Sequence, residues 1–313
     1  MALDEASQQF VATMAEGGGP ALHEQTPAMA RLTGPIFASM SGAGPEVGEV
    51  TNLELDGDGG QFRVRVLRPK GEAKAIIVYY HGGGWVLGDI DLQYDTVARH
   101  LVDRSGCTVV MVNYRKAPEY RFPVAVDDSY AALEWVDQHR GELAVDGAPL
   151  IVAGDSAGGN LSAVMTQRSR DRSGPKIDFQ VLVYPVTDCD MERGSYNAEQ
   201  NQLILAKPTM EWFFDHYEPD VEKRKHPDLS PIRHENLADL PPAFVLLAEC
   251  DPLHDEGREY AEKLQAAGNE VALEVADGQM HAFFQMANVL PGYEAGMNRV
   301  VEKIDEFVSK AGK

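Results

Sequence analysis

Cysteine is scarce in this sequence, with 3 among 313 residues. Cys107, Cys189 and Cys250 are odd in number and widely spaced, which excludes a disulfide framework and indicates a reducing compartment. No Cys/His cluster has the spacing of a zinc site, so we expect no metal. No run approaches the roughly 18 apolar residues of a transmembrane helix. The acidic N-terminal residues predict no signal peptide, so we expect a cytoplasmic protein.

Basic residues are also few, because 28 Lys and Arg face 49 Asp and Glu, which gives a net charge of -21. A surface of this charge repels nucleic acid and anionic membranes, so we expect neither as a partner. Hydrophobic residues make up 44% of the chain. This length and composition are sufficient for one large α/β domain or two modest ones.

Strand and helix patterns alternate along most of the chain. Strands are expected at 50–55, 62–67, 75–80, 108–113, 149–153, 179–184, 243–249 and 271–275, and helices at 92–103, 124–139, 161–170, 255–267 and 293–308. The first two strands flank Asp-Gly-Asp-Gly-Gly, a hairpin signal. The runs at 75–80 and 108–113 are continuously apolar, as in strands covered on both faces. The pattern predicts an α/β fold with a mostly parallel sheet and helices on both faces.

Two segments stand outside this alternation. Residues 1–45 have helix-like apolar spacing at 6–15 and 27–40, and several of their apolar side chains have no place in a sheet. Residues 187–236 are too long for a connection in a compact α/β unit. We therefore predict a core of residues 46–186 and 237–313, a helical cap inserted at 187–236, and an N-terminal arm that contributes to the cap. A loosely docked arm is the alternative.

A G-x-S-x-G pattern at residues 154–158 lies between an apolar strand and a helix. A nucleophilic Ser156 at this position would sit on a sharp strand-to-helix turn with its oxygen clear of the backbone. Side chains at Gly154 or Gly158 would collide with neighbouring segments. Because the helix begins directly after Ser156, its free N–H groups face any oxyanion formed there. The pattern also occurs by chance, so it needs partners elsewhere in the chain.

Backbone donors for an oxyanion are expected in two places. The sequence His-Gly-Gly-Gly-Trp at 81–85 follows a buried strand, and its glycines expose N–H groups without side-chain obstruction. The N–H of Ala157 would supply a further donor. A phosphate-binding loop is the alternative, but no Lys-Ser/Thr pair follows, and Asp89 and Asp91 are close in sequence.

An acid and a histidine follow the ends of later strands. The order Ser156, Asp251, His281 is that of α/β-hydrolase triads, and each residue lies just past a strand, where open α/β sheets place their sites. His281 would take the proton of Ser156, and Asp251 would hold the imidazole tautomer. Among the rivals, Glu249 is expected within the strand and Asp255 at the N-cap of the next helix. His254, beside the acid, is the competing histidine.

Several motifs together carry a family resemblance. They are HGGGW at 81–85, NYRKAPE at 113–119, FP at 122–123, GDSAGGN at 154–160, DPL at 251–253 and MHAF at 280–283. In this order they resemble the bacterial hormone-sensitive-lipase-like esterases, in the branch with Asp before the nucleophile. The resemblance runs from about residue 45 to the C-terminus, and Cys250 and Asn113 are minor departures from it. It implies an α/β-hydrolase fold and oxyanion donors at Gly83, Gly84 and Ala157.

The resemblance also implies a function. We expect a serine carboxylesterase that hydrolyses short- to medium-chain carboxylic esters through an acyl-enzyme, without a cofactor. An amidase or lactonase would use the same triad. A binding-only protein, like the plant gibberellin receptors that resemble this family but lack the histidine, is disfavoured by His281. The acidic, non-secreted character disfavours a true lipase.

We expect Trp85, Leu205 and Phe213 to bind the substrate. The strand at 271–275 could be an exposed edge of the sheet, which favours a homodimer.

Overall fold

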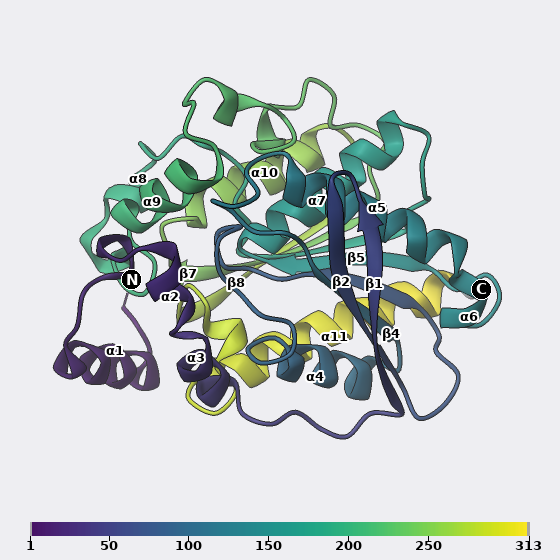
Figure 1. Ribbon diagram of the computed structural model, residues 1–313, viewed down its shortest axis with the longest axis horizontal. Coiled ribbons are helices and arrows are strands. Elements are labelled where there is room, and N and C mark those ends of the chain that lie inside the picture. Colours follow the sequence, from purple (N-terminus) through teal and green to yellow (C-terminus); the bar gives the residue numbers. More distant parts are fainter. Residues whose placement is uncertain (1, 312–313) are drawn as a thin grey trace.

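A twisted eight-stranded sheet runs through the centre of the computed structural model, which describes residues 2–311 (Figure 1). Its strands are β1 (Glu49–Gly57), β2 (Gly60–Arg68), β3 (Ile76–Tyr80), β4 (Thr108–Asn113), β5 (Leu150–Asp155), β6 (Phe179–Val183), β7 (Ala243–Cys250) and β8 (Val271–Met280). They lie in the order β1-β2-β4-β3-β5-β6-β7-β8. The pairs β1–β2 and β2–β4 are antiparallel, and all other neighbours are parallel.

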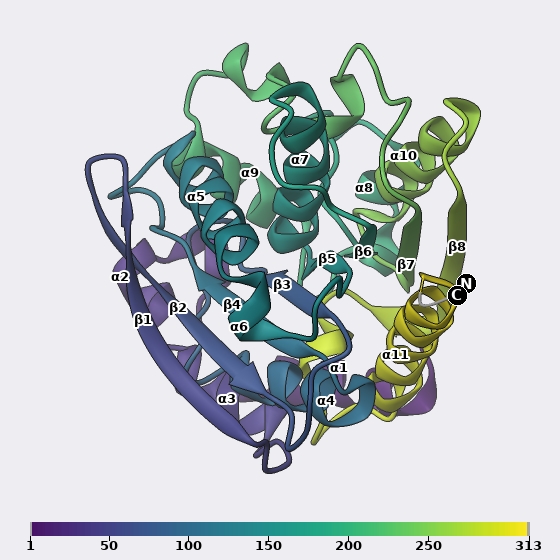
Figure 2. The same ribbon diagram turned by 90° about the vertical axis from the view of Figure 1, so that its right-hand side faces the viewer.

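Helices cover both faces of this sheet (Figure 2). One face carries α5 (Val124–Gln138), α7 (Ala157–Asp171) and α10 (His254–Ala266), with the short α6 (Arg140–Leu143) at the end of α5, and the other carries α4 (Asp95–Ser105) and α11 (Gly292–Ala311). Successive side chains of a strand point to opposite faces. In β3, Ile76 and Val78 therefore enter the core under α5 and α7, whereas Ile77 and Tyr79 enter the core under α4 and α11.

The N-terminal arm and the segment 187–236 gather at one end of the sheet, at the left of Figure 1. The arm consists of α1 (Glu5–Gly17), η1 (Leu22–Glu24), α2 (Pro27–Arg31) and α3 (Gly34–Ser41). The inserted segment holds α8 (Gly194–Asn197), η2 (Glu199–Asn201), α9 (Lys207–Tyr217), η3 (Lys223–Lys225) and η4 (Pro231–Arg233). The two segments touch, because the indole N–H of Trp212 donates a hydrogen bond to the carbonyl of Gln25 at 3.1 Å.

The predicted fold class is confirmed, since the sheet is mostly parallel and covered by helices on both faces. The single helix expected at 27–40 was wrong, because this stretch forms two helices. The chain forms α2 and α3 with a break at Leu32 and Thr33, because Pro35 lies at the start of α3, where a missing N–H costs nothing. Among residues 2–311, no helix combines the length and the apolar character needed to cross a bilayer.

Candidate active site

Ser156 stands on a sharp turn between β5 and α7. Its backbone has φ 56° and ψ −121°, an unfavourable conformation for a residue with a side chain. The turn is held by a hydrogen bond from the Ser156 N–H to the carbonyl of Val183 at 2.9 Å. A Cβ at Gly158 would overlap the carbonyl oxygen of Tyr80, and one at Gly154 would overlap the backbone of Gly158. Both glycines are therefore required by the close approach of α7 to β3.

His281 connects Ser156 to Asp251 through both of its ring nitrogens. The Nε2 atom lies 3.0 Å from the Ser156 Oγ, and the Nδ1 atom lies 2.7 Å from the Asp251 Oδ2. Because a carboxylate only accepts hydrogen bonds, Nδ1 carries the proton and Nε2 is left to accept the proton of the serine hydroxyl. Asp251 is fully buried, and its other oxygen accepts the Leu253 N–H at 2.9 Å. The structure thus brings together the three residues that the sequence pointed to.

The rival acids and the rival histidine have other partners. Glu249 lies within β7 and accepts the N–H of Gly278 at 2.6 Å. Asp255 accepts the N–H of Ser195 at 2.7 Å. The expectation that Asp255 caps α10 is wrong, because the helix begins at His254 and Leu253 occupies the cap position. The Nδ1 atom of His254 lies 2.8 Å from the carbonyl oxygen of Ala248.

The glycine loop after β3 faces Ser156. Gly83 and Gly84 have φ values of 109° and 57°, in the region that favours glycine. Within residues 2–311, the N–H groups of Gly83, Gly84 and Ala157 have no hydrogen-bond acceptor, and the first two residues line the same cavity as Ser156. His81, at the start of the loop, is fully buried, and its ring stacks on that of Tyr114 with centroids 4.3 Å apart. Burial holds the pKa of His81 well below the usual range.

A cavity of about 220 Å³ opens above Ser156 and His281. Its walls come from the glycine loop, the inserted segment, the arm, the segment before α4 and the segment after β8. Outside the glycine loop and the triad, the lining residues include Leu22, Ala30, Arg31, Thr33, Phe37, Leu87, Asp89, Gln93, Tyr94, Ile204, Leu205, Thr209, Phe213, Ala282 and Gln285. Most of these side chains are apolar, which suits an uncharged organic substrate. Leu205 and Phe213, which the sequence analysis expects to bind the substrate, are among the lining residues. Within residues 2–311, no group of three or more His, Cys, Asp or Glu side chains is arranged to hold a metal ion.

Comparison with known proteins agrees with this geometry. Residues 77–285 match the model of the α/β-hydrolase fold family. The chain belongs to this family. It is 39% identical over 260 residues to the esterase LipI of Mycobacterium tuberculosis, covering 82% of this chain and 81% of that protein. It is 35% identical over 279 residues to the ethyl acetate hydrolase of Pseudomonas putida, covering 87% of each.

Solved structures show the same relationship for this α/β-hydrolase. A thermostable esterase from Pseudomonas putida ECU1011 superposes with a TM-score of 0.92 at 34% identity, over 98% of both chains. The resemblance inferred from the sequence motifs is therefore confirmed at the level of the family and the fold.

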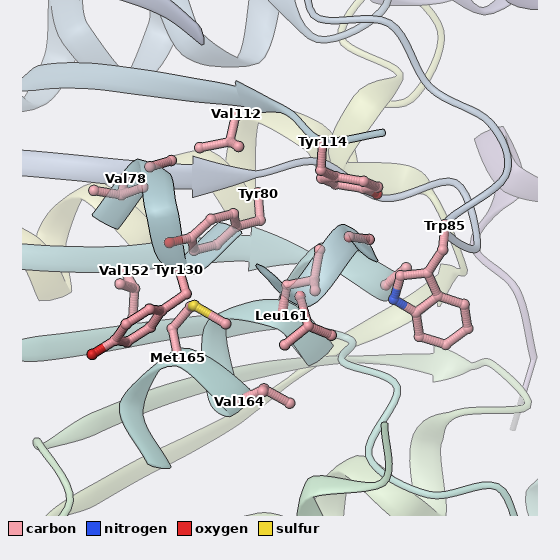
Figure 3. Close-up of a cluster of buried hydrophobic side chains, with 14 of the residues drawn as sticks. Val78, Tyr80, Trp85, Val112, Tyr114, Tyr130, Val152, Leu161, Val164 and Met165 are labelled. Carbon is pink, nitrogen blue, oxygen red and sulfur yellow. The ribbon is translucent and has the colours of Figure 1, made fainter. Parts of the chain in front are cut away.

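Trp85 does not line the cavity of this α/β-hydrolase, so the expectation that it binds the substrate was wrong. Its backbone has φ 61°, and its fully buried indole stacks on Tyr217 with ring centroids 4.5 Å apart. Figure 3 shows the indole in the same buried cluster as Tyr114 and Leu161. A large aromatic side chain gains more from this burial than from a partly solvated wall, so the loop turns Trp85 toward the core.

Sequence reasoning missed three polar residues around the site. Asp155 buries its carboxylate directly before Ser156, and Gln285 lies four residues after His281 and lines the cavity. Arg31 of the arm also lines the cavity, donates from Nε to the carbonyl of Val86 at 3.0 Å, and forms a double hydrogen bond with the carboxylate of Glu119. Only the position of Asp155 beside the serine offered a signal in the sequence.

Proposed function

We propose that this protein is a serine carboxylesterase in which Ser156 is the nucleophile, His281 the general base and acid, and Asp251 the residue that orients the imidazole. The continuous chain of contacts from the Asp251 carboxylate through His281 to the Ser156 Oγ, at 2.7 and 3.0 Å, carries this proposal. The names of the relatives, which are esterases and ester hydrolases, support the same reaction.

The reaction follows from the geometry in two halves. The Ser156 Oγ attacks the ester carbonyl carbon while its proton passes to the His281 Nε2, and the carbonyl electron pair moves onto the oxygen. The N–H groups of Gly83, Gly84 and Ala157 receive this oxyanion. When the carbon–oxygen bond to the alcohol breaks, His281 returns the proton to the leaving alcohol. Water, deprotonated by His281, then attacks the acyl-enzyme while the same N–H groups bind the oxyanion. The carbon–oxygen bond to the Ser156 Oγ breaks, His281 returns the proton to this oxygen, and the acid is released.

The cavity favours short- to medium-chain acyl esters. At about 220 Å³ it lies below the range of about 300–1,000 Å³ typical of pockets for drug-sized ligands. Its apolar walls include Leu205 and Phe213 of the segment 187–236 and Phe37 of the arm. We propose that these two segments form the cap over the core and that Leu205 and Phe213 bind the substrate.

Replacement of Ser156 by alanine tests the assignment. The variant should fold as the wild type does and lose turnover of p-nitrophenyl butyrate down to a residual about 10³–10⁴ above water. The same preparations assayed with butyryl-p-nitroanilide and a γ-lactone show whether amides or lactones are also substrates. Turnover of the butyrate near the wild-type rate by purified Ser156→Ala would remove Ser156 from the role of nucleophile.

The outer strand β8 supports a proposal about assembly. It pairs with β7 along one edge, and no other strand of residues 2–311 pairs with its second edge. An open strand edge can pair with another chain. We propose that two copies form a homodimer at this edge, and light scattering of the purified protein distinguishes a dimer from a monomer.

A further inference from the structure

The carboxylate of Asp155 is fully buried directly before Ser156. Its Oδ1 accepts the Tyr79 hydroxyl at 2.9 Å and the Gly82 N–H at 3.1 Å. Its Oδ2 accepts the Tyr94 hydroxyl at 3.1 Å and the Gln285 Nε2–H at 2.7 Å. All four donors are uncharged. A buried carboxylate without a cationic partner is costly, so its presence calls for an explanation beyond packing.

The surroundings of Asp155 fit the ionised form. Burial raises the pKa of Asp155, while the hydrogen bonds from Tyr79, Gln285 and Tyr94 act in the opposite direction. Burial also raises the pKa of both tyrosines well above the usual range, so the phenols keep their protons and donate. Four donors occupy the lone pairs of the carboxylate and leave no acceptor for a proton on it.

The four donors belong to the parts of the site that must be aligned with Ser156. Gly82 directly precedes Gly83, the first proposed oxyanion donor. The peptide bond between His81 and Gly82, at the start of the glycine loop, is fixed at both ends. Its N–H is held by Asp155, and its carbonyl, that of His81, accepts the Tyr114 hydroxyl at 2.7 Å. Gln285 lies in η5 (Phe283–Gln285), in the segment that carries His281.

We propose that Asp155 is a positioning residue, which fixes the glycine loop and the His281 segment relative to Ser156 and so sets the alignment of the oxyanion donors. This inference rests on the proposed function of Ser156 and His281. Asp155 does not touch the substrate, since it does not line the cavity. Its negative charge also interacts favourably with a protonated His281, which forms when the serine is deprotonated.

The test compares Asp155→Asn with wild type, with Ser156→Ala and with Asp128→Asn as a matched control. Asp128 is another fully buried carboxylate, which is bound to Arg115 at 2.7 Å and does not line the cavity. For Asp155→Asn we expect kcat on p-nitrophenyl butyrate to fall roughly 10- to 100-fold, while KM stays within about threefold. Binding of a trifluoromethyl ketone, whose adduct places an oxyanion against the same donors, should weaken by a similar factor.

A fall in kcat with little change in KM, together with weaker binding of the trifluoromethyl ketone, is a readout that a merely structural role would not move. Asp128→Asn should lose thermal stability and keep the wild-type kcat, KM and inhibitor affinity. A kcat of Asp155→Asn within about twofold of wild type, or an equal loss in Asp128→Asn, overturns the proposal.

The experiments also distinguish failure of the proposed function from failure of Asp155→Asn to fold. If Ser156→Ala stays active, the proposed function fails, whatever Asp155→Asn does. If Asp155→Asn does not fold, Gln285→Leu removes the link between Asp155 and the His281 segment, together with the hydrogen bond that the Gln285 Oε1 accepts from Gln93 at 2.6 Å. That variant should lower kcat several-fold, with KM within about threefold and a weaker trifluoromethyl ketone complex. An unchanged kcat in Gln285→Leu contradicts the role assigned to the network.

Discussion

Shortening Phe213 to leucine should move the acyl-chain optimum of the enzyme toward longer esters. The phenyl ring is 6% exposed and lines the cavity above Ser156. It lies so close to Gly84 that a Cβ on that glycine would overlap the ring. Phe213 therefore closes the cavity beside the proposed oxyanion donors, and a smaller side chain there leaves room for additional methylene groups of the acyl chain.

The expected size of the effect follows from hydrophobic transfer. Each methylene group buried against the cavity wall contributes about 0.8 kcal/mol, or about fourfold in kcat/KM. For the wild type, kcat/KM should rise from acetyl to about butyryl or hexanoyl and then fall well before palmitoyl, because further carbons displace the cap. Phe213→Leu should gain up to about 16-fold, relative to its own butyrate rate, for a chain two carbons beyond the wild-type optimum.

The assay is kcat/KM along a series of p-nitrophenyl esters from acetate to palmitate. Phe214→Leu is the matched control, because Phe214 is the neighbouring residue of α9, is fully buried beside Trp85, and does not line the cavity. Ratios between chain lengths are compared, so that a general loss of activity cancels. An unchanged optimum in Phe213→Leu, or an equal change in Phe214→Leu, refutes the location of the acyl chain against Phe213.

Three further predictions concern the acid, a buried glutamate and the arm. Asp251→Asn should lower kcat by roughly 10⁴. Asp255→Asn should change kcat by less than about tenfold, because its amide oxygen still accepts the Ser195 N–H and only the charge is lost; steady-state kinetics compare the two variants. Burial raises the pKa of Glu256 from 4.5 to about 8. The folded state then holds this proton more tightly than the unfolded state, so the free energy of unfolding should fall as pH rises from about 4.5 to about 8 and level off above, by up to a few kcal/mol. Glu256→Gln should flatten this dependence in urea unfolding measured across pH, and a wild-type stability that rises over this window contradicts the assignment. Arg31→Met should remove the hydrogen bonds that join the arm to Val86 and Glu119, raise KM for the butyrate ester and speed limited proteolysis within residues 1–45; unchanged values for both mean that the arm is held by other contacts.

The sheet and the three triad positions could be predicted because their signals are local. A buried parallel strand shows as a continuous apolar run, and the residue that follows such a run lies at the carboxyl edge of the sheet. Ser156 and Asp251 follow buried strands directly, whereas His281 follows the half-buried outer strand β8. Their chain order limited the choice further, and position separated Glu249, which was expected within the strand. His254 stayed a rival until the structure placed its Nδ1 atom beside the carbonyl of Ala248.

The residues that line the cavity were harder to predict from the sequence, because lining depends on the direction in which each side chain points. Trp85 adjoins the glycine loop, but its positive φ turns the indole away from the cavity and into the core. The contributions of Arg31 and Gln285 depend on contacts between segments far apart in the chain, such as that of Arg31 with Glu119. Asp155 likewise joins Tyr79 to Gln285, and neither periodicity nor spacing records such a contact.

Labelling with a p-nitrophenyl alkylphosphonate tests the central claim that Ser156 is the nucleophile of an ester hydrolase. The serine oxygen displaces p-nitrophenolate from phosphorus, and the stable phosphonyl adduct is located by peptide mass spectrometry. We predict one adduct per chain, on the peptide that carries Ser156, formed in proportion to the loss of activity on p-nitrophenyl butyrate and not formed in Ser156→Ala. Inactivation with the adduct on another residue, or full activity with Ser156 labelled, would contradict the account.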